Sequence, residues 1–67
     1  MPRRDTDTAL ATAFLALAAL YRATNAFYNS PTPANERRMM DYERTYNAAE
    51  ATLTAARAAR NRFTKPA

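Results

Sequence analysis

The groups that could take part in catalysis are few in this chain. It has 67 residues and contains neither histidine nor cysteine, so the commonest general base, the thiol nucleophile and the usual zinc ligands are missing. Carboxylates, tyrosines, threonines, Ser30 and Lys65 remain. A short helical chain offers these groups no deep pocket that would shift their pKa values for acid–base work. We therefore expect no catalytic residue, no small-molecule substrate and no enzymatic activity.

Three glutamates repeat every seven residues and form what we call the glutamate row: Glu36, Glu43 and Glu50. On a helix this spacing puts them on one stripe, with neighbours about 10 Å apart at about 1.5 Å per residue. Carboxylates on facing helices can hold two metal ions, but such sites normally add a histidine from a Glu-x-x-His motif. We expect neither a metal nor a cofactor, and a row that is solvated or ion-paired beside the contact between helices.

Six cations near the chain ends form what we call the basic end: Arg3, Arg4, Arg57, Arg60, Arg62 and Lys65. Asp5 and Asp7 offset part of this set and the other charges of the chain cancel, so the whole formal net charge of +4 lies there. Three interpretations compete for it. The cations could complement a helix dipole and keep the chain soluble, bind nucleic-acid phosphates, or bind an acidic groove on a protein. Arginine suits phosphate, but only Phe63 could stack on bases and no helix-turn-helix pattern is present.

Aromatic residues supply a second candidate surface, because tyrosine is a frequent interface anchor. The group consists of Tyr21, Tyr28, Tyr42 and Tyr46, with Phe27. Most of these residues fall at the helical spacing of the predicted core, so we expect their rings to pack there and their hydroxyls to reach the rim. Four apolar residues are expected to be partner-binding anchors: Leu20, Phe27, Tyr28 and Met40.

Two long helices must carry all these groups. The sequence lacks glycine, valine and isoleucine and is richest in alanine, a composition that favours helices over strands. The one strong break is Asn29-Ser30-Pro31-Thr32-Pro33. We predict an all-α chain with helices over about 5–29 and 32–63. The first should be capped within Asp5-Thr6-Asp7-Thr8, and the second by Ser30 or Thr32 with a proline in its first turn.

Folding back at the break gives an antiparallel helical hairpin. In the first helix, residues spaced by three and four form what we call the leucine–aromatic stripe: Leu10, Phe14, Leu17, Tyr21, Thr24 and Tyr28. The equivalent residues of the second helix are Met39, Tyr42, Tyr46, Ala49, Leu53, Ala56 and Phe63. One antiparallel register matches the two sets, from Thr24 against Met39 to Leu10 against Leu53, with Phe14 facing Ala49. We therefore predict that these two stripes form the core.

Two helices alone make a thin core. A chain of this length buries too little apolar surface to be comfortably stable without a staple or a partner, and disulfides are excluded without cysteine. Leu15, Leu20, Phe27 and Met40 fall outside the predicted core, and alanines on the first helix would let another helix approach closely. We therefore expect a single domain over residues 1–67 that dimerises into a four-helix bundle. The alternative is a hairpin bound to a larger partner.

The N-terminal residues, with an uncharged run from Ala9 to Tyr21, loosely resemble a signal peptide. Asp5 and Asp7 weaken that match, and the run is shorter than the roughly 20 residues that span a bilayer, so a cytoplasmic protein is expected. Its expected function is that of a small adaptor, regulator or inhibitor, of the kind a phage or mobile element encodes, which binds a protein or itself. The alternative is a regulator that contacts nucleic-acid phosphates through the basic end. Binding at a membrane surface is a third hypothesis.

Overall fold

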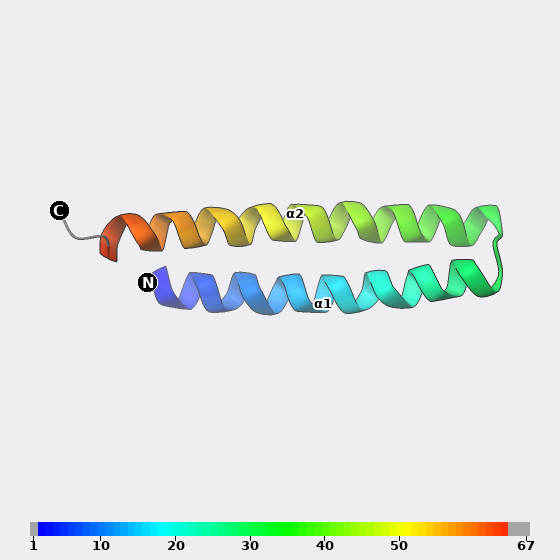
Figure 1. Cartoon of the computed structure of the whole chain (residues 1–67), viewed down its shortest axis with the longest axis horizontal. Coiled ribbons are helices and arrows are strands. Elements are labelled where there is room, and N and C mark those ends of the chain that lie inside the picture. Colours follow the sequence, from blue (N-terminus) through cyan, green and yellow to red (C-terminus); the bar gives the residue numbers. More distant parts are fainter. Residues whose placement is uncertain (1, 65–67) are drawn as a thin grey trace.

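Two helices of similar length make up the chain. The computed structural model describes residues 2–64, with side-chain positions for residues 6–61. Helix α1 spans Pro2–Asn29 and helix α2 spans Pro33–Thr64. They run antiparallel, side by side, and give a rod of 54 × 14 × 14 Å (Figure 1). The prediction of an all-α antiparallel hairpin is confirmed.

Helix α1 begins three residues earlier than expected. It starts at Pro2 instead of Asp5, which is permitted because a proline in the first turn lacks only an N–H that has no intrahelical partner there. Thr6, expected near the cap, consequently lies inside the helix and is buried.

The turn is built around Thr32, and its cap and proline are as predicted. The side-chain oxygen of Thr32 accepts a hydrogen bond from the backbone N–H of Asn35 at 3.2 Å, and Pro33 is the first residue of α2. The Asn35 side chain reaches back across the turn, where its Nδ2 donates to the carbonyl oxygens of Ser30 at 2.8 Å and Ala26 at 3.5 Å. Asn35 therefore links the start of α2 to the end of α1.

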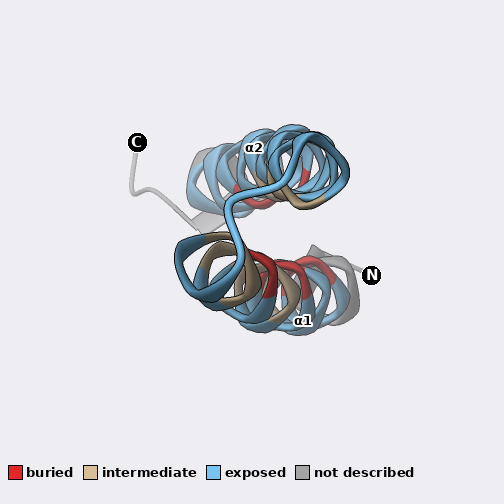
Figure 2. Cartoon of the chain, turned by 90° about the vertical axis from the view of Figure 1, so that its right-hand side faces the viewer, coloured by how far each residue is buried: buried red, intermediate tan, exposed pale blue. Residues whose placement is uncertain are grey.

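Small residues of α1 form its side of the core, and this corrects the predicted packing. The buried residues of α1 are Thr6, Ala9, Ala13, Ala16 and Ala23. In Figure 2 they lie along the inner side of the helix, facing α2. Phe14 and Tyr21 were expected in the core but are 64% and 63% exposed. The helix is thus turned about its axis relative to the prediction, since alanines let the two backbones approach while large side chains from α2 fill the space between them.

The core residues of α2 largely agree with the prediction. Ala49 and Leu53 are buried, and Tyr46 and Ala56 pack against them in one cluster with the alanines of α1. Met39 is partly buried, and Tyr42 is 38% exposed at the edge. The predicted contact of Phe14 with Ala49 is wrong, because Phe14 lies outside the core. The register itself is not contradicted, since Leu10 and Leu53, and also Leu17 and Tyr46, line one cleft. The side chain of Phe63 lies outside the described residues.

Candidate docking face

The leucine–aromatic stripe runs along a flank of α1 that no other part of the described chain covers. Phe14, Tyr21 and Tyr28 are 64%, 63% and 76% exposed, while Leu10 and Leu17 are partly buried at the edge of the core. The stripe therefore keeps the heptad spacing of a helix-packing surface without having a helix packed on it.

A cleft joins this stripe to α2. It has a volume of about 200 Å³ and is lined by Leu10, Ala13, Phe14, Leu17, Tyr46, Glu50, Leu53 and Arg57. Its floor is apolar, and its α2 edge carries one carboxylate and one guanidinium. This combination can hold an apolar ridge flanked by charge, but it has no group placed for bond chemistry.

The glutamate row borders the same flank. Phe14 and Glu50 line one cleft and so lie at the same level of the hairpin. The helices are antiparallel, so moving toward the Ser30–Thr32 loop means going up in number on α1 and down in number on α2. Seven residues, or about two helical turns, lead from Phe14 to Tyr21 and from Glu50 to Glu43. Seven more lead to Tyr28 and Glu36. The exposed aromatic rings and the exposed carboxylates therefore form two parallel rows. We call these rows and the cleft between them the docking face.

One hydrogen bond orders the α2 edge of the docking face. The Tyr46 hydroxyl donates to Glu50 Oε2 at 2.9 Å. This bond raises the pKa of Tyr46 above its usual 10.0, with smaller contributions from burial, the charge of Glu50 and the nearby Tyr21. The bond was not foreseen from the sequence, although the spacing of four residues on a helix permits such a contact.

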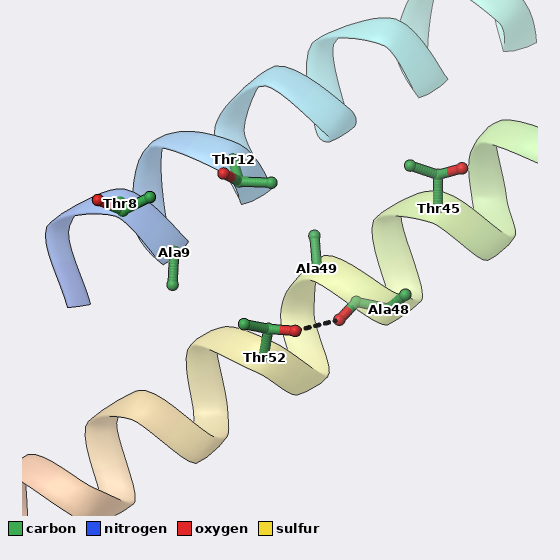
Figure 3. A pocket seen from close by; sticks show the side chains of 7 residues that line it. All are labelled: Thr8, Ala9, Thr12, Thr45, Ala48, Ala49 and Thr52. Atoms are coloured by element: carbon green, nitrogen blue, oxygen red, sulfur yellow. Dashed lines mark hydrogen bonds between the residues drawn. The ribbon is translucent and has the colours of Figure 1, made fainter. Parts of the chain in front are cut away.

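The other flank of the hairpin carries a groove of small residues. It has a volume of about 600 Å³ and is lined by Thr8, Ala9, Thr12, Thr45, Ala48, Ala49 and Thr52 (Figure 3). The hydroxyls of Thr45 and Thr52 each donate to the carbonyl oxygen four residues earlier, at 3.1 Å. Those two hydroxyls are thus bonded within their own helix. The described residues that line this groove are all threonines and alanines, so they supply neither the large side chains nor the carboxylates of the docking face.

The basic end is described only in part. Arg57 is exposed and lines the docking cleft, and Arg60 is exposed and has an interaction within the chain. The side chains of Arg3, Arg4 and Arg62, and the whole of Lys65, lie outside the described residues. Nearer the hairpin turn, Arg22 and Arg38 from different helices line a smaller cleft of about 190 Å³.

The four expected anchors fall into two pairs. Tyr28 is exposed and Met40 is 50% exposed, whereas Leu20 and Phe27 are partly buried. The rings of Phe27 and Tyr28 lie 6.0 Å apart between centroids and are tilted by 53°. Tyr28 belongs to the docking face.

Two further properties bear on the site. Among the described residues, no group of three acidic side chains lies close enough to hold a metal ion.

The part of α1 from Thr6 to Asn29 is long and apolar enough to cross a membrane, judged by length and composition only. Its most apolar stretch of 18 residues has a mean hydropathy of 1.3, and 17% of that stretch is buried. Core helices of soluble proteins and signal sequences share these properties.

No family model matches the chain, and neither a curated protein nor a solved structure shows significant similarity to it.

Proposed function

We propose that this chain is a small non-enzymatic protein-interaction module of the cytoplasm that acts through its docking face as an adaptor, regulator or inhibitor. The observation that carries the proposal is the exposure of Phe14, Tyr21 and Tyr28 in one heptad-spaced row. Burying an aromatic side chain of this kind contributes about 1.5–3 kcal/mol, so leaving three in water disfavours the uncovered hairpin. A helix packed on the row would recover that free energy.

A second copy of the chain is one such cover. Packing the leucine–aromatic stripes of two hairpins against each other gives a four-helix bundle, in which α1 lies beside the α1 of the other copy. The hairpin has reason to self-associate, because no described side chain is completely buried in its thin core. Large side chains would then lie between the hairpins, and alanines would remain inside each one.

Sedimentation equilibrium of the purified chain over a range of concentrations tests this proposal. The wild type should dimerise, and Tyr21→Ala should shift the equilibrium to monomer. The matched control is Leu15→Ala, which removes a side chain that is 73% exposed outside the docking face and should leave the dimer intact. Equal effects of the two substitutions would rule out the docking face as the site of self-association.

A further inference from the structure

We infer that the docking face receives a basic amphipathic helix from a protein partner, an inference that rests on the proposed function and names the partner's chemistry. The juxtaposition that supports it is the exposed aromatic row of α1 beside the glutamate row of α2. A helix lying in the cleft between them would complete a three-helix bundle. Its apolar ridge would contact Phe14 and Tyr21, and its flanking lysines or arginines would reach Glu43 and Glu50.

The spacing of the two rows suits a helix. Residues seven apart lie about 10 Å from each other along a helix, so successive aromatic rings and successive carboxylates recur at the heptad interval of a packed helix. Phe14 and Glu50 line the same cleft. A docked helix parallel to α1 or α2 would therefore meet one ring and one carboxylate every two turns.

The hairpin leaves Glu43 and Glu50 without an ion pair to a described residue, whereas Glu36 at the turn end shares a cleft with Arg37 and Arg44. Glu50 accepts its hydrogen bond from the neutral Tyr46. From Thr8 to Tyr21, α1 contributes no charged side chain. Arg22, the next cation of α1, lines the cleft on the other flank. Among the described residues, Arg57 is the one cation lining the docking cleft, and it lies beyond Glu50 at the end away from the turn.

Charge also favours a basic helix over a second copy of the chain as the occupant of the docking face. In a four-helix bundle formed by contact between leucine–aromatic stripes, α2 lies beside the α2 of the other copy, so two glutamate rows meet. If the two rows run antiparallel and overlap over their whole length, at least one carboxylate lies level with a carboxylate of the other copy. Like charges repel, so this contact is unfavourable. A basic helix instead supplies opposite charge to Glu43 and Glu50, so it should displace the second copy.

A synthetic peptide pair provides the test. The probe is a fluorescein-labelled helical peptide of three heptads, with leucines at the core positions and arginines flanking them. Its matched control carries glutamates in place of the arginines. Fluorescence anisotropy with the full chain should show binding of the arginine peptide and weaker or no binding of the glutamate peptide. Glu43→Lys should weaken binding of the arginine peptide about fivefold or more. Asp41→Lys, the same charge change outside the docking face, should have a clearly smaller effect.

The remaining outcomes overturn the inference in distinguishable ways. If both peptides bind equally, or if Asp41→Lys acts as strongly as Glu43→Lys, the glutamate row does not select the partner, although the docking face stands. If neither peptide binds while the chain dimerises in a Tyr21-dependent manner, the occupant is a second copy and the proposed function survives. If neither peptide binds and the chain is monomeric, the inference and the proposed function fall together.

Discussion

The Tyr46 hydroxyl donates to the carboxylate of Glu50, one helical turn further along α2, at 2.9 Å. Both residues line the cleft that also contains Phe14 of α1. The bond therefore holds a carboxylate in place beside an exposed aromatic ring instead of leaving it to move freely in solvent. A partner helix would meet an acidic group that is partly ordered in advance, which lowers the entropy lost on binding.

The same bond predicts how Tyr46 ionises. The hydrogen bond to Glu50 raises the pKa of Tyr46 above 10.0, so the neutral phenol is favoured in the folded chain. The associated stabilisation is complete below the pKa of an unfolded tyrosine and is lost as the pH rises through the higher folded value. Glu50→Gln should lower the pKa of Tyr46, which can be followed through tyrosinate absorbance with the other tyrosines replaced by phenylalanine. An unchanged titration curve would show that the bond does not persist in solution.

Asn35 should be important for the stability of the turn. Its side chain donates to the carbonyl of Ser30 at 2.8 Å and to that of Ala26 at 3.5 Å. Asn35→Ala should lower the free energy of unfolding by about 1 kcal/mol, which is typical of a lost hydrogen bond or cap. Thermal unfolding followed by circular dichroism measures this change. Asn47→Ala is the matched control, because Asn47 is exposed in the middle of α2 and alanine favours the helix there. An equal loss in the control would remove the special role of Asn35.

The architecture could be predicted from the sequence because local chemistry determines it. The proline-rich break, the Thr32 cap and the helical composition each depend on neighbouring residues only. The packing of α1 could not be predicted in the same way. Its apolar residues fill two adjacent stripes, one of alanines and one of leucine and aromatic residues, and hydropathy favoured the larger side chains. The choice of the alanines depends on the bulk of Leu53 and Tyr46 on the facing helix, which is a tertiary effect.

The same limit applied to the candidate site. The glutamate row and the exposed position of Met40 follow from helical periodicity alone, whereas the same periodicity placed Tyr28 in the predicted core stripe. The exposure of Phe14 and Tyr21 beside the glutamates could be predicted only by knowing which stripe of α1 faces α2. The cleft lined by Phe14 and Glu50 is thus a consequence of the alanine core and could not be located without it.

Enlarging the alanine core should separate the two stripes of α1 experimentally. Ala13 is 6% exposed between the helices, so Ala13→Leu would force them apart and should lower the free energy of unfolding by about 1–3 kcal/mol. Ala18→Leu makes the same change at an exposed position and should be nearly neutral. Chemical denaturation of both variants gives the comparison. If Ala13→Leu proved as stable as Ala18→Leu, the predicted core of leucine and aromatic residues would regain support.

Salt should act in opposite directions on the two proposed complexes. Two glutamate rows repel each other in the dimer, so raising the ionic strength from about 0.05 M to about 0.5 M should tighten self-association by screening them. The arginine peptide is held partly by attraction to the same row, so its affinity should fall over that range. Sedimentation and anisotropy on one protein preparation measure the two trends.

Removing the charge should reproduce the effect of salt. Glu43→Gln should tighten the dimer and weaken the peptide complex, and it should also reduce the salt dependence of both. Asp41→Asn is the control, since Asp41 pairs with Arg44 on the same helix and is not a member of the glutamate row. If both complexes weakened in parallel with salt, attraction between opposite charges would dominate both. The glutamate row would then not distinguish a basic helix from a second copy of the chain.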